Sequence, residues 1–447
     1  MGKKNYIISA PMNMCLRNLI HSSFEINDEN VYLFTDIKIK PKLLKEFGFK
    51  IKKIFSYSIF SKLSRGLYFL LSSVDTIRTV RKKKWTTMSL IEREIKKNKK
   101  LDKIISNDFK FTFNPISKLL SLNVFYYLFK IIIFILLFIF SLKYIFKLLK
   151  INPKKILFLH AHSNNDKILL FAANLLKIKS ESLVHSWDNP TTKLALSIKS
   201  DRYYTWNNEI KNEMKYLNDI PSKKIFCLGV IQFDSYFKLI SKKKRKRKKV
   251  ITIFLPSTGL VSEQNQKFFF DKLLQNINFT EFKVIIRSHP GIIFNWLKLL
   301  EQNYSNVTLN IPESIVKADK TSDIISRKDL KFNSLHELLN NTDIVINYFS
   351  TTSLDACFFE IPIINICINK ETENSLDWYY RWSHYKKLLN YEAIYVCKNF
   401  NNLKNKLSYF SKKSTLKNKN AKLVKKKLIM NLNGLSGLML SKSFFNK

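Results

Sequence analysis

A run of hydroxyl residues in the second half of the chain is well suited to bind a phosphate. It consists of Ser350, Thr351, Thr352 and Ser353. An apolar run at 344–348 precedes it, and a short helical pattern and a second apolar run follow it, so we expect one strand–helix–strand step. Free N–H groups at a helix start attract anions, and hydroxyls add donors without bulk. A cap needs only one hydroxyl, so we prefer a phosphate site over simple capping by Ser350 or Thr351.

Two other predicted strands of the second half end in residues that suit the same ligand. The run 250–255 leads to Ser257, Thr258 and Gly259, and the run 282–286 leads to Arg287 and His289. Arg287 offers a rigid fork of donors to a phosphate, and His289 offers one more. Parallel strands of an open α/β sheet bind ligands at their carboxyl ends, so we expect one shared site.

Asp355 lies in the first turn of the helix that follows the hydroxyl run. We expect its carboxylate to accept hydrogen bonds from ribose hydroxyls. The alternative is that it only complements the positive end of the helix dipole.

The segment 185–193 carries the candidate catalytic group of the first half. Asp188 follows a predicted strand and precedes a predicted helix, where a carboxylate can take a proton from a substrate hydroxyl. The alternative is an Asx turn or a helix cap. The side chains around it are further candidates for the same site, namely His185, Trp187, Asn189, Thr192 and Lys193. His160 and His162 have no carboxylate or thiol at a ligand spacing, so we expect no metal.

These residues require strands and helices to position them, and both halves of the chain alternate the two patterns. The alternation predicts an α/β fold with two domains facing a cleft. We assign 1–241 to the first domain, 242–249 to a basic linker, 250–405 to the second domain and 406–447 to C-terminal helices. The basic run in the linker is alternatively a nuclear import signal or a nucleic-acid patch.

The most apolar segment spans about 119–149, and its uninterrupted apolar run covers only 131–142. Lys130 precedes this run, and Lys143, Lys147 and Lys150 follow it with helical spacing. We favour a helix that lies in a membrane interface. A single membrane span and a buried core helix are the alternatives, because short apolar runs are ambiguous.

Charge and cysteine content limit the environment and the partners. The 447 residues include 77 Lys and Arg against 34 Asp and Glu, a formal net charge of +43. Anionic lipid, phosphorylated substrates and nucleic acid are the candidate partners, with compositional drift as the alternative. The 5 cysteines form no CxxC pair, which indicates buried thiols in a reducing compartment. We expect a cytoplasmic protein attached to the inner face of the membrane.

Taken in order, these motifs resemble the GT-B glycosyltransferase superfamily, and most of all the CDP-glycerol glycerophosphotransferase-like proteins of surface-polysaccharide biosynthesis. The similarity covers roughly 155–400 and, more faintly, 4–22. It rests on the segments 186–193, 229–234, 287–290, 350–356 and 361–363. Three positions depart from the family pattern: Asp188 stands in place of His, Asp355 in place of Glu, and Ile361 in place of Gly.

The resemblance implies two Rossmann-like domains and a transferase with no metal and no other cofactor. A nucleotide-activated donor would bind the second domain, and a surface glycan or lipid-linked acceptor would bind the first. The acceptor side would consist of His185, Trp187, Asn189, Thr192 and Lys193. Asp188 would act as the base, while Arg287, His289 and the hydroxyl run stabilise the leaving diphosphate. The Asp at position 188 favours the surface-glycan relatives over the glycerophosphotransferases.

Two other functions compete with this interpretation. A nucleotide-sugar 2-epimerase would share the donor domain and would need no membrane helix. A basic nucleic-acid-binding protein would account for the charge, but it would interleave aromatic and basic residues on one exposed face. The aromatic residues here lie mostly in apolar runs, so we expect no nucleic-acid partner.

Overall fold

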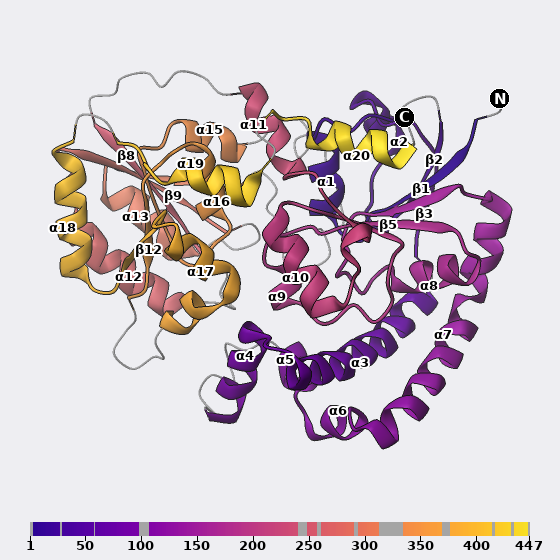
Figure 1. The fold of residues 1–447 in the computed structure, drawn as a ribbon. Helices are drawn as coiled ribbons and strands as arrows, with labels where there is room; N and C mark the ends of the chain where they lie inside the picture. The colour runs from indigo at the N-terminus through magenta and orange to yellow at the C-terminus, as the bar shows by residue number, and fades with distance from the viewer. Residues whose placement is uncertain are drawn as a thin grey trace.

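Two parallel β-sheets with helices around them form the molecule (Figure 1). The structure is a computed structural model. It describes residues 3–26, 29–57, 59–97, 107–239, 248–256, 261–289, 294–312, 334–368, 376–413, 416–430 and 433–445. The predicted α/β architecture with two facing units is confirmed. Residues 240–247, which cover most of the predicted basic linker, lie outside the described residues.

The first sheet has seven strands in the order β3-β2-β1-β4-β5-β6-β7. All of its pairings are parallel. Its strands are β1 (Asn5–Ser9), β2 (Asn30–Phe34), β3 (Ile51–Phe55), β4 (Lys155–Phe158), β5 (Lys179–Leu183), β6 (Arg202–Thr205) and β7 (Ile225–Cys227). The chain order reverses between β1 and β4, and this reversal places a ligand crevice at the carboxyl ends of the strands.

Strand residues of the first sheet alternate between two helical layers. Tyr6 and Ile8 pack into a core with the helices of one face, and Ile7 packs into a second core on the other face. The first layer contains α1 (Asn13–His21) and α20 (Ser436–Phe445), with α2 (Pro41–Glu46) at its edge. The second layer contains α3 (Ile59–Lys82), α7 (Asn123–Ile151) and α8 (Lys167–Leu175).

Further short helices surround the first sheet. Figure 1 shows three of them beyond the lower end of α3: α4 (Thr86–Lys97), α5 (Asn107–Thr112) and α6 (Pro115–Leu120). The others are α9 (Asn189–Thr192), α10 (Asn208–Asn218), α11 (Asp234–Leu239) and the 3-10 helices η2 (Ser222–Lys224) and η3 (Ile231–Phe233). The predicted apolar segment at about 119–149 is thus divided, since α6 ends at Leu120 and α7 begins at Asn123.

The second sheet has six parallel strands in the order β10-β9-β8-β11-β12-β13. They are β8 (Lys249–Phe254), β9 (Phe282–Arg287), β10 (Val307–Asn310), β11 (Ile344–Asn347), β12 (Ile363–Ile366) and β13 (Tyr395–Cys397). Its helices are α12 (Glu263–Asn276), α13 (Asn295–Asn303), α15 (Ser334–Asn340), α16 (Thr352–Phe358), η4 (Leu376–Arg381), α17 (Ser383–Asn390), α18 (Phe400–Ser411), α19 (Ala421–Val424) and the π-helical turn η5 (Lys425–Ile429).

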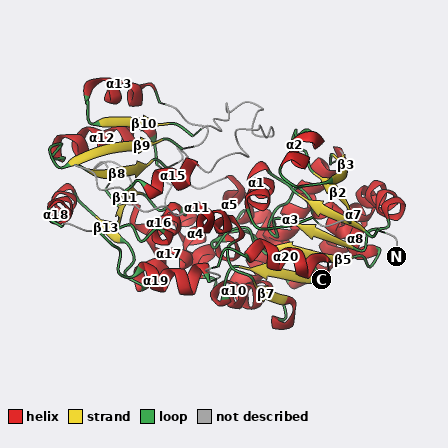
Figure 2. Cartoon of the chain, turned by 90° about the horizontal axis from the view of Figure 1, so that it is seen from above, coloured by secondary structure: helices red, strands yellow, loops and turns green. Residues whose placement is uncertain are grey.

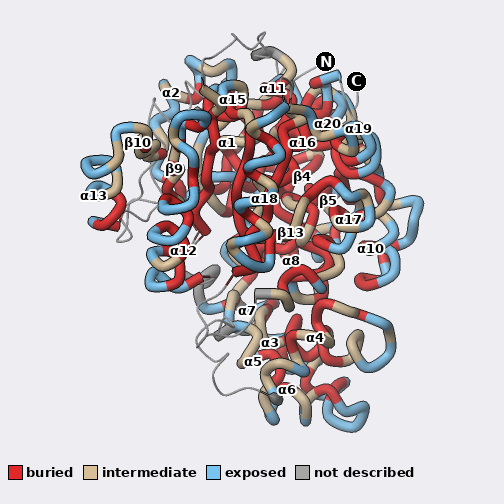
Figure 3. Tube along the Cα trace, turned by 90° about the vertical axis from the view of Figure 1, so that its left-hand side faces the viewer, coloured by how far each residue is buried: buried red, intermediate tan, exposed pale blue. Residues whose placement is uncertain are grey.

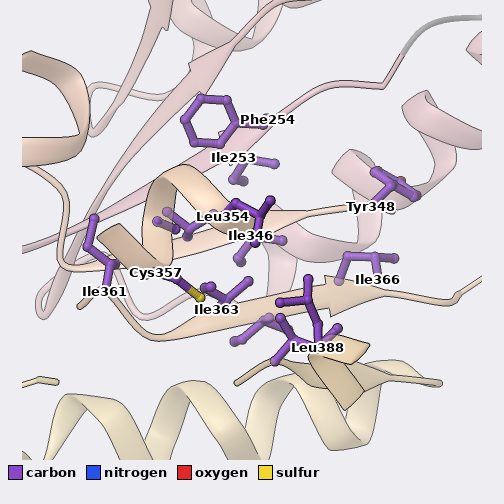
Figure 4. Close-up of a cluster of buried hydrophobic side chains, with 14 of the residues drawn as sticks. Ile253, Phe254, Ile346, Tyr348, Leu354, Cys357, Ile361, Ile363, Ile366 and Leu388 are labelled. Atoms are coloured by element: carbon purple, nitrogen blue, oxygen red, sulfur yellow. The ribbon is translucent and has the colours of Figure 1, made fainter. Parts of the chain in front are cut away.

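The core of the second sheet fixes the position of the hydroxyl run. Leu354 and Cys357 of α16 are fully buried and lie beside Ile346 and Ile363 of the flanking strands (Figure 4). Together they confirm the predicted strand–helix–strand step at 344–366. Residues 350–353 therefore connect a buried strand to a buried helix, and the loop cannot move far without disturbing this core.

Two segments late in the chain cross from the second unit to the first. Helix α17 lies against α10, where Lys387 pairs with Glu213 at 2.7 Å. Helix α20 lies on the first sheet (Figure 1), and its Phe444 and Phe445 pack on the ring of Tyr6 at centroid distances of 5.3 and 4.9 Å. Figure 2, seen from above, shows both sheets with these helices around them. Both segments therefore contribute contacts between the two units.

Candidate functional site

The candidate catalytic segment follows strand β5 of the first sheet, which lies next to the central strand β4. Residues 184–188 leave the end of β5, and Asp188 precedes the single turn of α9. The backbone N–H groups of Thr191 and Thr192 donate to the Asp188 carbonyl oxygen, which fixes the turn. Asn189 is buried, and its side-chain oxygen accepts a hydrogen bond from the Ser186 N–H at 3.0 Å. Asn189 therefore shapes the turn.

A cavity of about 350 Å³ joins this segment to the hydroxyl run of the second unit. The first unit contributes Phe109, Trp187, Asp188, Thr192 and Lys193 to its wall. The second unit contributes Phe349, Thr351, Tyr379, Trp382, His384 and Tyr385. The Trp187 indole Nε1 donates to Thr351 Oγ1 at 3.4 Å, which closes the gap between the units. Asp188 and Thr351 thus lie on opposite walls of one cavity, although their roles remain predictions.

The carboxylate of Asp188 has two hydroxyl donors within its own turn. Ser186 Oγ donates to Oδ1, and Thr192 Oγ1 donates to Oδ2 at 2.7 Å. Burial by itself raises the pKa of Asp188, but the neighbouring His384, these two hydroxyls and the Lys193 ammonium outweigh burial. The net pKa lies below the ordinary value for Asp, because these groups stabilise the charged form more than burial penalises it. Asp188 is therefore ionised at neutral pH.

His384 of α17 is a site residue that the sequence analysis missed. Its ring meets the Trp187 ring edge-on at a centroid distance of 4.9 Å. Burial lowers the pKa of His384 to about 4, against the Asp188 charge, which raises it. The imidazole is therefore neutral at pH 7, and among the described residues its Nδ1 has no hydrogen-bond partner. It follows an aromatic-rich segment, 378–382, and that segment was the only signal in the sequence.

The four hydroxyls of the predicted phosphate run point in different directions. Thr351 faces the cavity. Ser350 Oγ accepts from the Thr352 N–H at 3.2 Å and lies 3.0 Å from Thr352 Oγ1, so these two residues make a local turn. Ser353 is fully buried among Asn347 and Asn365, at 3.3 and 3.4 Å. The structure therefore leaves Ser353 facing the core and Thr351 facing the cavity.

The other predicted donor-side residues lie at the same edge of the second sheet but outside this cavity lining. Arg287 ends β9, and its guanidinium donates to the Asn310 side chain. His289 follows two residues later and is half-buried. Strands β9 and β11 flank β8, so these residues are separated from the hydroxyl run by one strand. Ser257, Thr258 and Gly259, which follow β8 in the sequence, lie outside the described residues.

Asp355 has a contact between the two units. It is buried, and its Oδ1 accepts a hydrogen bond from the Tyr236 hydroxyl of α11 at 2.6 Å. Burial raises the pKa of Asp355 to about 6, and the Tyr236 bond partly opposes this. This contact gives Asp355 a structural role between the units. Its contact with a ribose remains a prediction.

A second cavity of about 280 Å³ lies beside the first, on the first unit. The two cavities share Phe109, Thr192 and Lys193. The remaining walls combine apolar and polar side chains from α3, α5, the end of β4 and the segment 194–196. The polar ones include Ser72, His160, His162, Ser163 and Asn165. The second cavity is therefore adjacent to the one that Asp188 lines, with Thr192 and Lys193 common to both.

Buried histidines form the floor beneath this second cavity. The rings of His160 and His185 stack at a centroid distance of 5.2 Å, and His185 Nδ1 lies 3.6 Å from Cys15 Sγ. His185 is thus in the floor behind the cavities and not in either lining. Burial lowers the pKa of His162 to about 3, and the charges of Lys167 and Lys193 add to this. In the described parts of the chain, no three His, Cys, Asp or Glu residues gather as metal ligands do.

Comparison with known proteins identifies the fold. No protein-family model matches the chain, and no curated protein sequence matches it either. Among solved structures, the UDP-GlcNAc 2-epimerase of Methanocaldococcus jannaschii is 12% identical and aligns with a TM-score of 0.52 over 100% of both chains. The S. aureus MnaA protein, solved with UDP, is 8% identical, with a TM-score of 0.53 over 99% of this chain and 97% of its own.

A third similar structure is the UDP-GlcNAc 2-epimerase of Neisseria meningitidis, bound to UDP-GlcNAc. It is 12% identical and aligns with a TM-score of 0.51 over 100% of both chains. At such identities the likeness concerns the fold alone. Two doubly wound parallel sheets facing each other across a cleft, aligned over the whole chain, define the architecture.

Proposed function

We propose that this chain, which has the GT-B fold, transfers a sugar or glycerophosphate-like group from a nucleotide-activated donor to a hydroxyl of a glycan or lipid-linked acceptor. One observation carries the proposal. An ionised carboxylate, Asp188, lines a cavity shared with the second unit, and its hydrogen-bond partner Thr192 lines both this cavity and a second one confined to the first unit. A transferase needs this arrangement because its base must reach an acceptor while the donor lies opposite.

Asp188 acts as the proton acceptor in the proposed reaction. The acceptor hydroxyl donates a hydrogen bond to the carboxylate and attacks the electrophilic centre of the donor. The new bond forms as the bond to the diphosphate breaks, and the proton passes to Asp188. Because the pKa of Asp188 is low, the proton moves to the carboxylate late in the reaction, when formation of the new bond has made the acceptor hydroxyl acidic.

Lys193 and Thr351 are the groups best placed to meet the leaving diphosphate. Both line the cavity with Asp188, and Lys193 is exposed within reach of both cavities. A cation and a hydroxyl aimed at developing negative charge lower the barrier to its departure. Two structural neighbours were solved with UDP or UDP-GlcNAc, which supports the proposal that the donor is a nucleoside diphosphate derivative.

The second cavity suits a hydroxyl-rich acceptor. Neutral histidines and the side chains of Ser72, Ser163 and Asn165 present donors and acceptors to it. Aromatic walls from Tyr68 and Phe109 suit the apolar face of a sugar ring. The cavity thereby supports the assignment of the acceptor to the first unit.

The competing function is that of a nucleotide-sugar 2-epimerase, which the similar solved structures suggest. Inversion at a carbon that carries hydrogen requires this hydrogen to leave and return. An epimerase run in D₂O would therefore leave deuterium in the sugar, whereas transfer to an acceptor would leave none. The acceptor cavity beside Asp188 favours transfer, because an epimerase has no second substrate to bind.

A thermal-shift screen against CDP-, UDP-, GDP- and CMP-linked compounds tests the donor. A true donor at 100 times its dissociation constant stabilises the fold by about 2.7 kcal/mol. The compound that stabilises is then incubated with the protein in D₂O, with and without candidate glycan acceptors. Release of the nucleotide that depends on an acceptor supports transfer, and deuterium in the recovered sugar without an acceptor contradicts it.

A further inference from the structure

The outer surface of α6 and α7 is a broad apolar area without a partner in the described structure. We call the following residues the outer face; each is exposed by 39% or more: Ile116, Leu119, Leu122, Val124, Phe125, Tyr127, Leu128, Ile131, Ile132, Ile135, Phe138, Ile139, Leu142, Phe146 and Leu149. Figure 1 shows α7 along the outer edge of the molecule, with α6 at its lower end. Soluble monomers rarely expose a contiguous apolar patch of this extent.

The opposite side of α7 is part of the core of the first unit. Tyr126, Phe129, Ile133, Leu137, Tyr144 and Leu148 recur at helical spacing and are buried against α3 and α8. The chain enters α7 after β3 and leaves it into β4, and β4 pairs directly with β1. A helix fixed in this way cannot cross a bilayer, because the sheet on both sides of it would have to be divided.

Length and composition alone would allow α7 to cross a membrane. In its most apolar window, however, only 28% of the residues are buried within the protein. The helix is therefore neither a core helix nor a free span. One face belongs to the protein, and the other face lacks a partner.

The charges around the outer face point to an anionic surface. Residues 115–151 contain five lysines and no Asp or Glu. Lys143 and Lys150 are exposed at the edge of the face. Lysine stems extend along an apolar surface while their ammonium groups reach phosphates, which is the pattern of helices that lie in the headgroup region.

The acceptor cavity is built by the same helical layer. Tyr68, Phe69 and Ser72 of α3 line it, and α3 packs against α7. Phe69 also contacts Phe111, whose ring lies at a centroid distance of 5.4 Å and is 43% exposed near the start of α6. The cavity wall and the outer face are thus two sides of one group of helices.

We propose that the outer face lies flat on an anionic lipid bilayer, with α7 in the plane of the headgroups, and that it brings the acceptor cavity to the membrane. The docking itself stands on the exposed face and its charges. The consequence for the acceptor, a lipid-linked molecule whose reactive hydroxyl lies at the bilayer surface, rests on the function proposed above.

Vesicle co-sedimentation of the full chain tests the docking without any substrate. We expect binding to vesicles of phosphatidylcholine with phosphatidylglycerol, and at least ~10-fold weaker binding to phosphatidylcholine alone or in high salt. The double variant Ile131→Glu/Ile135→Glu should lose at least ~10-fold in binding, because both side chains are exposed and enter the bilayer interface. The variant Lys143→Glu/Lys150→Glu should lose the preference for anionic lipid.

The matched control is Leu299→Glu on α13, a similarly exposed apolar residue of the second unit, which should bind as the unchanged protein does. Equal melting temperatures show that the variants are folded. Unchanged binding of the Ile131→Glu/Ile135→Glu variant would overturn the proposal. A dimer in solution that this variant dissociates would also overturn it, because the outer face would then contact a second copy. Resistance of the bound chain to alkaline carbonate washing would overturn it too, because it would indicate a membrane span. If the unchanged protein binds the vesicles but transfers no group to any acceptor, the result counts against the proposed function and not against the membrane docking.

Discussion

At the residue scale, Asp188 is held by its own turn before any substrate binds. Ser186 and Thr192 each donate a hydroxyl to its carboxylate, and both lie within four residues of it. An asparagine has nearly the same shape and can keep one of these bonds through its amide oxygen. Position 188 therefore allows the charge to be removed with little change in structure.

We expect Asp188→Asn to reduce transfer by about 10²–10⁴-fold, because the base is lost from an otherwise intact site. Donor affinity in the thermal-shift assay should persist, since the carboxylate faces the acceptor. The conservative control is Asp271→Asn on the exposed surface of α12, which should transfer normally. Transfer by the Asp188→Asn variant at the unchanged rate would remove Asp188 from the mechanism.

Buried histidine makes stability depend on pH in a defined direction. Burial lowers the pKa of His185 to about 4, against the charge of Asp188, while in the unfolded chain it is ~6.5. The unfolded state therefore binds the proton first, and the stabilising contribution, complete above pH ~6.5, is lost as the pH falls toward 4. At pH 5 this single group would cost about 2 kcal/mol.

The variant His185→Asn should reduce this loss, because asparagine cannot be protonated in the unfolded chain. Urea denaturation at pH 7.5 and at pH 5 measures the difference for each protein. The loss of unfolding free energy between the two pH values should be smaller in the variant. An equal loss in both proteins would show that His185 titrates alike in the folded and unfolded states.

At the element scale, the carboxylate of Asp234 binds the start of α20 to the first unit. Asp234 is buried, and its side chain accepts hydrogen bonds from Ser436 N at 3.1 Å, Gly437 N at 2.7 Å and Ser23 Oγ at 2.7 Å. Asp234 begins α11 directly after the first sheet is complete. A single residue therefore joins the start, the middle and the end of the chain.

We expect Gly437→Ala to destabilise the protein by about 1–3 kcal/mol, because the added methyl overpacks the contact between α20 and the loop after α1. Its Cβ would lie 2.5 Å from Ser22 Oγ, 2.6 Å from Phe24 N and 2.8 Å from Ser23 N. Gly66→Ala in α3 is the matched control, since no atom lies within 4 Å of its Cβ. The control should be neutral or stabilising by up to ~1 kcal/mol, because alanine favours helix. Equal unfolding midpoints for the two variants would contradict the close packing of α20.

The sequence revealed the elements better than it revealed their contacts. The apolar runs around 344–348 and 363–368 predicted β11 and β12, because strands buried on both faces read as continuous apolar runs. Strand β3 was missed, because Lys52 and Lys53 interrupt its pattern at the exposed edge of the sheet. An apolar sequence pattern therefore identifies a strand only where the strand is buried, because burial is what requires apolar side chains.

The candidate site was predicted in part for the same physical reason. The strand-end rule placed Asp188 and the hydroxyl run on one crevice, and the structure places Asp188 and Thr351 on one cavity. The approach of His384 depends on α17 crossing between the units, and the inward turn of Ser353 depends on Asn347 and Asn365. Both are tertiary contacts between distant positions, and no local spacing encodes them.

At the scale of the whole molecule, buried and exposed surface follow the two units. Figure 3 shows buried segments running through both, with exposed turns around them and the α3–α6 helices extending below. The net charge of +43 belongs to the whole chain, whereas the proposed ligand site is a cavity of about 350 Å³. Non-specific attraction of anions by the net charge and specific binding of a ligand in the cavity are therefore separate properties of this protein.

That separation predicts different responses to salt. Duplex DNA should bind at low ionic strength through phosphate contacts alone, and this affinity should fall steeply with salt, with a slope of about −0.9 for each phosphate neutralised. Stabilisation by the nucleotide-activated donor should survive the same salt, because its contacts lie within a cavity. Fluorescence anisotropy and thermal shift, measured over one salt series, compare the two. DNA binding that resists salt, together with no stabilisation by any nucleotide derivative, would favour the nucleic-acid-binding alternative.

The return of α20 to the first sheet has a consequence for synthesis on the ribosome. Tyr6 is covered by Phe444 and Phe445, so the first sheet cannot complete its core until residues 436–445 have left the exit tunnel. The second sheet contains only residues between 249 and 397, so it can fold while the first still waits. The half of the protein that is made first is therefore finished last. During that interval its apolar surfaces, including α7, are available to chaperones or to a nearby membrane.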